Sequence, residues 1–128
     1  MEPVFLSLGE IVEIHDNQIE LYGGKKGIRD LGLLQSAVAI PKARFGGDFL
    51  HTELCDMAAA YLFHIVQNHA FVDGNKRTGA VAAYVFLALN GIELTAGEQA
   101  FENLVRRVAD GKADKANVAA FLRRHTGT

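Results

Sequence analysis

The stretch HAFVDGNKRTG, residues 69–79, contains side chains that could hold an anion beside a base. Asp73, Gly74 and Asn75 precede an apolar run that is expected to be a helix, so the first free amides of that helix would point into this stretch. Helix N-termini attract anions because these N–H groups lack partners and the helix dipole adds partial positive charge. Gly74 would let the backbone approach a ligand closely, and Asn75 could hydrogen-bond it. The spacing therefore predicts an anion site.

The other polar residues of this stretch supply charge and a base. Lys76 and Arg77 would lie in the first helical turn, where positive charge opposes the dipole, so they suit phosphate binding better than helix stabilisation. Asp73 beside bound phosphates indicates a divalent cation, because Mg²⁺ binds carboxylate together with phosphate oxygens. His69 could accept the proton of an attacking hydroxyl, since imidazole titrates near neutral pH. These are the parts that phosphoryl or nucleotidyl transfer needs.

The same residues also have a purely structural interpretation. Asp73 could be a helix N-cap that pairs with Lys76 and Arg77, three and four residues further on. His69 could cap the end of the preceding helix. The residues alone leave both interpretations open.

The elements that must position this stretch are expected to be helices, because apolar residues recur at helical spacing. A capping box of Ser7 and Glu10 predicts one helix that ends at the glycines 23 and 24, and Asp30 is expected to cap a second helix. Further helices are predicted over residues 52–68, 76–90, 97–110 and 114–125.

Two details of this prediction concern the link after residue 90. Thr95 and Glu98 are expected to form the capping box of the fifth helix. Residues 92–95, IELT, could be a short strand or an extended link. Runs 52–68 and 76–90 are apolar on several faces, as in helices packed from more than one side. We therefore predict an all-α fold: a compact single-domain bundle of about six helices over residues 1–128, with the motif loop leading into a central buried helix.

Bulk composition excludes several classes of function. A net charge of −2 gives no general attraction to nucleic acid or to acidic membranes. The one cysteine, Cys55, excludes an internal disulfide and a thiol-rich zinc site, and we expect it to be buried. We find neither a signal peptide nor an apolar run of the roughly 18 residues that a membrane span needs. A cytoplasmic protein without a nucleic-acid or membrane partner is expected.

HAFVDGNKR resembles the signature of the Doc (death on curing) toxins, a branch of the Fic-domain superfamily with the pattern H-x-F-x-D-[GA]-N-K-R. The likeness extends to IHDNQIELYGG at residues 14–24 and to GIRDLGLLQSAVAIPKARFGG at residues 27–47. It implies the all-helical Fic fold, with ATP and Mg²⁺ as cofactors.

The resemblance also implies a role for each motif residue. His69 would be the general base that activates a target hydroxyl, and Asp73 would hold the magnesium ion. Gly74 and Asn75 would form the anion hole, and Lys76 and Arg77 would bind nucleotide phosphates. The catalytic set implied by the family is therefore His69, Asp73, Asn75, Lys76 and Arg77.

Two positions depart from the pattern of Fic adenylyltransferases, H-x-F-x-[DE]-G-N-G-R-x-x-R. Lys76 stands in place of the glycine, and Ala80 in place of the arginine that grips the γ-phosphate so that the α-phosphate is attacked. Doc proteins share both changes and are protein kinases that act on elongation factor Tu. The resemblance thus implies transfer of the γ-phosphoryl group of ATP to a threonine hydroxyl, which would arrest translation. Transfer of AMP to a protein hydroxyl, or a catalytically silent partner-binding domain, are the alternatives.

The resemblance implies protein partners as well. Lys25 and Lys26 lie in a glycine-rich segment, YGGKKGIRD, whose counterpart in Fic folds docks the target. A cognate Phd-like antitoxin is implied, whose C-terminal segment would cover the site. The remaining histidines receive no role: His64 is expected to pack on a helix, and His15 and His51 lack the acidic or thiol neighbours of a metal site.

Overall fold

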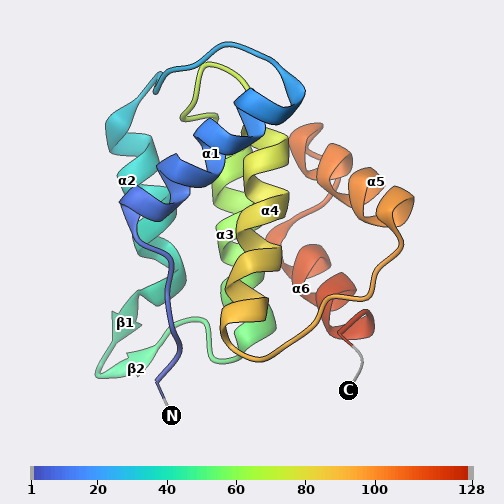
Figure 1. Ribbon diagram of the computed structural model, residues 1–128. Helices are drawn as coiled ribbons and strands as arrows, with labels where there is room; N and C mark the ends of the chain where they lie inside the picture. The colour runs from blue at the N-terminus through green and yellow to red at the C-terminus, as the bar shows by residue number, and fades with distance from the viewer. Residues whose placement is uncertain (1, 127–128) are drawn as a thin grey trace.

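The computed structural model describes residues 2–126, which form a helical molecule (Figure 1). In this part of the chain the α-helices are α1 (Leu8–Tyr22), α2 (Leu31–Ala39), α3 (Leu54–Asn68), α4 (Asn75–Leu89), α5 (Glu98–Ala109) and α6 (Lys115–Arg124). A 3₁₀ turn, η1 (Ile40–Lys42), follows α2 and leads into a short antiparallel hairpin of β1 (Arg44–Phe45) and β2 (Asp48–Phe49). The predicted all-α fold class is confirmed.

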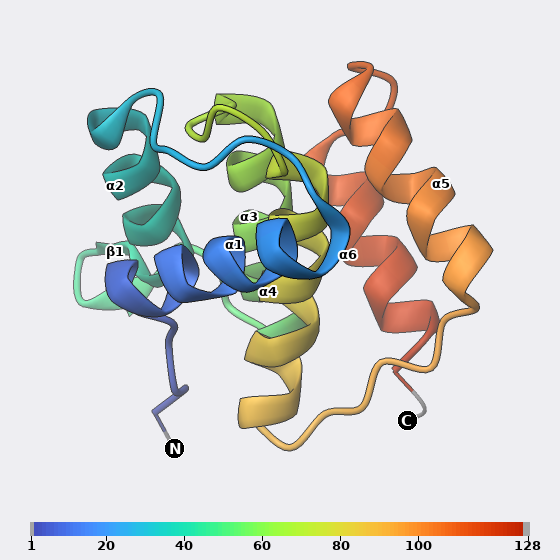
Figure 2. The ribbon, with the colours of Figure 1, turned by 45° about the horizontal axis from the view of Figure 1, so that its top comes forward.

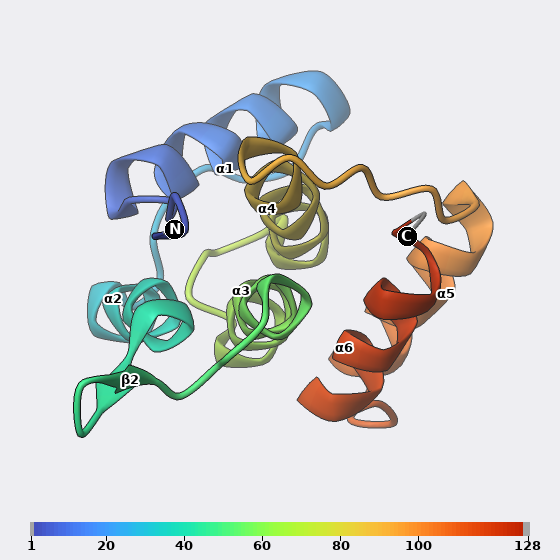
Figure 3. The ribbon, with the colours of Figure 1, turned by 90° about the horizontal axis from the view of Figure 1, so that it is seen from below.

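The helices α3 and α4 lie side by side at the centre of the molecule, as the view along them shows (Figure 3). Helix α1 lies against α4, α2 flanks α3 on one side, and α5 and α6 cover the other side. Gly79 brings the two central helices close together, because a Cβ atom there would lie 2.7 Å from Cγ2 of Val66 and 3.1 Å from the carbonyl oxygen of Leu62. The expectation that the second apolar run is a central buried helix is confirmed.

The loop that joins α3 to α4 is positioned by the segment that joins α1 to α2. Both loops lie at the same end of the molecule, and the α1–α2 segment passes beside the α3–α4 loop (Figure 2). Backbone hydrogen bonds connect the two loops: Val72 N–H donates to the Gly27 carbonyl over 3.0 Å, and Arg29 N–H to the Ala70 carbonyl over 2.7 Å. The α3–α4 loop, which the sequence predicts to carry the chemistry, is therefore held in place by the segment that joins α1 to α2.

Most helix ends lie where the capping residues predict. The Ser7–Glu10 capping box is present, and the Asp30 side chain accepts from Leu33 N–H at the start of α2. Helix α3 begins at Leu54, two residues later than predicted. The hairpin of β1 and β2 was not predicted, because its strands are only two residues long.

The predicted capping box of α5 is wrong. Gly97 is the N-cap residue and gives no side-chain hydrogen bond, while the Thr95 hydroxyl donates to the His125 carbonyl over 2.8 Å. This contact fastens the α4–α5 link to the end of α6, and residues 92–95 are an extended link rather than a strand. Over residues 2–126 no helix is both long and apolar enough to cross a membrane.

Candidate active site

The motif loop, residues 69–74, reverses the chain between the antiparallel helices α3 and α4. His69 ends α3 with φ 50° and ψ 46°, and Gly74 precedes α4 with φ 77°. His69 is the one non-glycine residue with positive φ among residues 2–126. Such a conformation is strained for a side chain with a Cβ atom and is common at functional sites. The backbone of His69 is thus a helix cap, as the structural interpretation expected, while its imidazole is exposed.

The Asn75 side chain holds the motif loop together. Its Oδ1 accepts from Phe71 N–H over 3.0 Å and its Nδ2 donates to the Phe71 carbonyl over 3.0 Å. Nδ2 also lies 3.4 Å from Nδ1 of His69, a distance too long to fix the tautomer of that imidazole. Because the buried Asn75 amide is taken up by the loop, the part of Asn75 available to an anion is its backbone N–H.

The Asp73 carboxylate is exposed and accepts two backbone hydrogen bonds, from Gly74 N–H at 2.8 Å and from Lys25 N–H at 3.2 Å. The N–H groups of Lys25 and Gly74 hold the pKa of this carboxyl below its usual range, so Asp73 is ionised at neutral pH. No ion pair joins Asp73 to Lys76 or Arg77 within the part of the chain described, and Gly74 rather than Asp73 is the N-cap. The structural interpretation therefore fails for Asp73.

The first turn of α4 leaves backbone amides available to a ligand. The first hydrogen bond of this helix runs from Thr78 N–H to the Gly74 carbonyl, over 3.0 Å, so the amides of Asn75, Lys76 and Arg77 precede it. Gly74 lets α1 lie against this turn, since a Cβ atom at Gly74 would be 3.0 Å from Cδ1 of Ile19. Free amides at a helix start are the arrangement that the predicted anion site requires.

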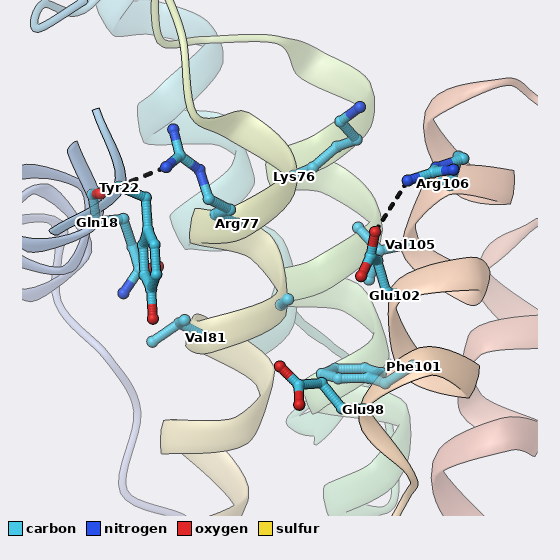
Figure 4. A pocket seen from close by; sticks show the side chains of 11 residues that line it. Gln18, Tyr22, Lys76, Arg77, Val81, Glu98, Phe101, Glu102, Val105 and Arg106 are labelled. Atoms are coloured by element: carbon cyan, nitrogen blue, oxygen red, sulfur yellow. Dashed lines mark hydrogen bonds and ion pairs between the residues drawn. The ribbon is translucent and has the colours of Figure 1, made fainter. Parts of the chain in front are cut away.

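The two cations of the motif, Lys76 and Arg77, lie differently. Arg77 reaches toward α1 (Figure 4), where Nη2 donates to the Gly23 carbonyl over 2.8 Å and Nη1 to the Gln18 carbonyl over 3.5 Å. Its guanidinium also lies 5.7 Å from the ring centre of Tyr22. Lys76 is exposed and extends away from α1 (Figure 4). Arg77 thus caps the end of α1, and Lys76 is the freer of the two cations.

Two hollows meet at Lys76 and Arg77. The first, which we call the motif cavity, has a volume of about 560 Å³ and is lined by the motif residues together with Val66, Gln67 and Ala109. The second, the α5 groove, has a volume of about 530 Å³ and lies between α1, α4 and α5 (Figure 4). Its walls include Tyr22, Val81, Phe101 and Val105, with Glu98 and Glu102 along α5. Ala80, where adenylyltransferases have an arginine, lines the α5 groove.

The predicted docking segment lies directly beside the motif loop. Lys25 and Lys26 are exposed, and Lys25 reaches the site through its backbone N–H, which binds Asp73. Gly24 permits this approach, because a Cβ atom there would lie 2.7 Å from Oδ2 of Asp73. The Arg29 side chain, which sequence reasoning missed, donates to the His69 carbonyl over 2.7 Å and so holds the strained end of α3.

His15 is a second residue that the sequence analysis missed. It is buried under the motif loop, its ring stacks on Phe71, and its Nε2 lies 2.8 Å from the Asp73 carbonyl oxygen. A signal was present in the sequence, because His15 is a polar residue at a position where α1 turns its apolar side inward, between Ile11 and Ile19.

His64 and Cys55 lie away from the motif loop. Residues 2–126 contain no cluster of three or more histidine, cysteine and acidic side chains of the kind that holds a metal ion through protein ligands alone. His64 packs against α6, with Nε2 3.0 Å from Nζ of Lys115, and burial lowers its pKa to about 4. Cys55 is buried, as expected.

Comparison with known proteins agrees with this geometry. The sequence pattern of the Fic/DOC family matches residues 5–87. A protein named toxin Doc from Mycolicibacterium smegmatis is 44% identical over 103 residues, which cover 79% of this chain and 79% of that protein. A protein named protein kinase doc from Escherichia phage P1 is 32% identical over 123 residues, which cover 96% of each chain. The resemblance seen in the motif is thereby confirmed, and the chain belongs to the Fic/DOC family.

Proposed function

We propose that this protein is the toxin of a toxin–antitoxin system and acts as a protein kinase in the cytoplasm. It transfers the γ-phosphoryl group of ATP to a threonine hydroxyl of a translation factor, elongation factor Tu by family resemblance, and so stops translation. The names of the two relatives, a toxin and a protein kinase, support this proposal.

One observation carries the proposal: an exposed imidazole, an ionised carboxylate and the free amides of a helix N-terminus line one cavity. His69, Asp73 and the first turn of α4 all border the motif cavity. An anion bound at the amides would lie beside both the base and the carboxylate. A structural loop would need none of these groups to face a common hollow.

The residues of the motif cavity divide the work of the reaction. His69 accepts the proton of the threonine hydroxyl while the threonine oxygen attacks the γ-phosphorus. The bond between the γ-phosphorus and the leaving oxygen of ADP breaks. The amides of α4 and the ammonium group of Lys76 stabilise the negative charge of the phosphoryl oxygens.

Asp73 fits the task of a magnesium ligand. Its carboxylate is ionised, and each oxygen accepts one backbone hydrogen bond, which leaves lone pairs directed to solvent. Bound Mg²⁺ would supply positive charge to the phosphate oxygens of the nucleotide. Asp73 would therefore orient the ATP–magnesium complex relative to His69.

The walls of the α5 groove favour γ-phosphoryl over AMP transfer. The side chain of Ala80 has no charge that could hold a phosphate group there, and Arg106 in the same groove is paired with Glu102 over 2.9 Å. Beyond Lys76 and Arg77, which also border the motif cavity, the charge left on this wall is that of Glu98, which opposes a triphosphate that extends along it. Phosphates are therefore expected to stay in the motif cavity, with the γ-phosphoryl group at the amides.

The α5 groove also suits the antitoxin. Its walls include the apolar and aromatic side chains of Tyr22, Val81, Phe101 and Val105, and it shares Lys76 and Arg77 with the adjoining motif cavity. An amphipathic segment that folds on binding needs such a groove for its apolar face. We propose that the C-terminal segment of a Phd-like antitoxin binds there and blocks access to the motif loop.

The proposal is tested with ATP that carries the label at either the α- or the γ-phosphate, incubated with the protein and purified elongation factor Tu. We expect labelled target from the γ-label only, on threonine. Labelled target from the α-label alone would mean that the protein is a nucleotidyl transferase and not a kinase. Absence of both transfer and ATP–magnesium binding would identify a silent binding domain. Mass spectrometry of the target identifies the modified residue.

A further inference from the structure

His15, in the middle of α1, supports the motif loop from below, and the proposed reaction gives it no task. The residue is 1% exposed. Its ring lies parallel to that of Phe71, with 3.8 Å between the ring centres and 4° between the planes. Nε2 lies 2.8 Å from the carbonyl oxygen of Asp73. A carbonyl oxygen can only accept, so Nε2 carries a proton and donates it to this hydrogen bond.

The hydrogen bond from His15 determines more than the position of one oxygen. The Asp73 carbonyl and the Gly74 N–H belong to the same planar peptide group, so fixing the carbonyl direction also fixes the N–H direction. That N–H donates over 2.8 Å to Oδ1 of the Asp73 side chain. The chain of contacts therefore runs from the His15 imidazole, through one peptide group, to the carboxylate.

Two further contacts hold the loop, one from α4 and one from α1. Phe71, on which His15 stacks, has both its backbone N–H and its carbonyl bound by the Asn75 side chain at the start of α4. One turn beyond His15, Cδ1 of Ile19 fills the space that a side chain at Gly74 would need. Helices α1 and α4 thus hold the loop between them, and His15 supplies the polar contact from α1.

We propose that His15 is a positioning residue of this site: by donating to the Asp73 carbonyl, it orients the Asp73–Gly74 peptide and with it the carboxylate that meets magnesium–nucleotide. The use of that carboxylate rests on the proposed function. The orientation itself does not, and it can be measured with no nucleotide present.

The test uses two substitutions that separate the stack from the hydrogen bond. His15→Phe keeps an aromatic ring against Phe71 and removes the donor. His15→Gln loses the ring and keeps an N–H donor. The control is His125→Phe, because His125 also stacks on a phenylalanine, with ring centres 4.1 Å apart, and its Nδ1 lies 2.8 Å from the Phe121 carbonyl oxygen.

Amide hydrogen exchange, read by NMR for each residue, is the first measurement. In His15→Phe we expect the amide protons of Gly74 and Lys25, which bind the Asp73 carboxylate, to exchange about tenfold faster. Amides in the middle of α3 and α4 should exchange as in the wild type. His15→Gln should retain most of the protection at Gly74 and Lys25, and His125→Phe all of it. Unchanged exchange at these two amides in His15→Phe would overturn the proposal.

The second measurement is the affinity for ATP–magnesium, which should fall about tenfold in His15→Phe and be largely restored in His15→Gln. Equal affinity in wild type and His15→Phe would overturn the positioning role. If the wild type binds no ATP, the proposed function fails and the exchange data still decide what His15 does.

A third measurement needs no variant and covers the case in which neither substitution folds. ¹⁵N NMR of the wild-type histidine rings distinguishes the two neutral tautomers of His15. We expect the proton on Nε2. A proton on Nδ1 alone would leave nothing to donate to Asp73 and would overturn the proposal.

Discussion

Helices α4 and α6 both have an aspartate, an asparagine and a lysine at their start, but only α6 uses the first two as a cap. At α6, the Asp114 side chain accepts from Asn117 N–H and the Asn117 side chain accepts from Asp114 N–H, so the helix end is closed by its own residues. At α4, Asp73 instead faces Lys25 and Gly74, and Asn75 turns back to the motif loop. No side chain of residues 2–126 caps α4, and its first amides remain available.

The lysines in the first turns of these helices differ in the same way. Each places positive charge where the helix dipole is also positive, which is unfavourable. Lys115 at α6 resolves this by donating to the neutral imidazole of His64, over 3.0 Å. Lys76 at α4 is exposed beside the motif cavity. One helix start is closed by its own side chains, whereas the other leaves its first amides uncapped, as the proposed anion site requires.

The largest effect is expected from removing the base. His69→Asn keeps a residue that tolerates the left-handed conformation of this position but has no group that titrates near neutral pH. We expect phosphoryl transfer and toxicity to be abolished while the thermal melt stays nearly unchanged. Transfer is followed with γ-labelled ATP and stability by calorimetry. A large loss of stability with activity retained would favour the purely structural interpretation of the loop.

The aspartates that precede α4 and α6 should separate binding from stability. Asp73→Asn is expected to remove magnesium-dependent ATP binding with little change in unfolding, because the exposed carboxylate caps no helix. Asp114→Ala should lower the free energy of unfolding by about 1 kcal/mol, through loss of an N-cap, and leave ATP binding intact. Calorimetric titration and urea unfolding measure the two properties. If the two variants change ATP binding and the free energy of unfolding to the same extent, the proposed difference between the two helix starts is wrong.

Two glycines with similar backbone conformations test how tightly α1 packs on the start of α4. Gly74 and Gly111 have φ of 77° and 74°, but a Cβ atom at Gly74 would lie 3.0 Å from Ile19, while nothing lies within 4 Å of one at Gly111. Gly111→Ala should cost about 1 kcal/mol, the penalty of the left-handed conformation alone. Gly74→Ala should cost more, about 2 kcal/mol, and also weaken ATP binding. Equal costs would mean that the close approach of α1 is unimportant.

A pH dependence is expected at the start of α6, confined to acidic solution. Burial, followed by the charges of Lys115 and His51, lowers the pKa of His64 from its ordinary 6.5 to about 4. Between these pKa values the unfolded chain binds a proton that the folded protein does not, so stability should fall as the pH drops from 6.5 toward 4. His64→Gln keeps an acceptor for Lys115 and should show a flatter profile in urea unfolding. Parallel profiles for the two proteins would contradict this assignment.

The sequence predicts the fold well because the signals are local. Capping residues such as Ser7 and Asp30 set helix starts, and apolar runs identify the central pair α3 and α4. The wrong prediction at Thr95 shows where local signals fail. The Thr95 side chain fits a local capping box, but it donates instead to the His125 carbonyl, 30 residues away in sequence. A contact of that range has no local pattern to reveal it.

The residue types of the candidate site could be predicted from the sequence, but the contacts that hold them in place could be predicted only in part. His69, Asp73 and the first turn of α4 meet at one cavity, as their spacing suggests. The supports do not follow from spacing, because His15 and Arg29 reach the motif loop from α1 and from the α1–α2 link. The hydrogen bonds of Arg77 to carbonyl groups at the end of α1 were likewise not predicted.

The most direct test of the difference between the two helix starts is an NMR titration of the wild-type protein with ATP and Mg²⁺, recorded as amide shifts. The amides of Asn75, Lys76 and Arg77 should shift in a saturable way that requires magnesium, while those of the first turn of α6 stay in place. If the α4 amides do not respond, or if both helix starts respond equally, the start of α4 is not a nucleotide-phosphate site.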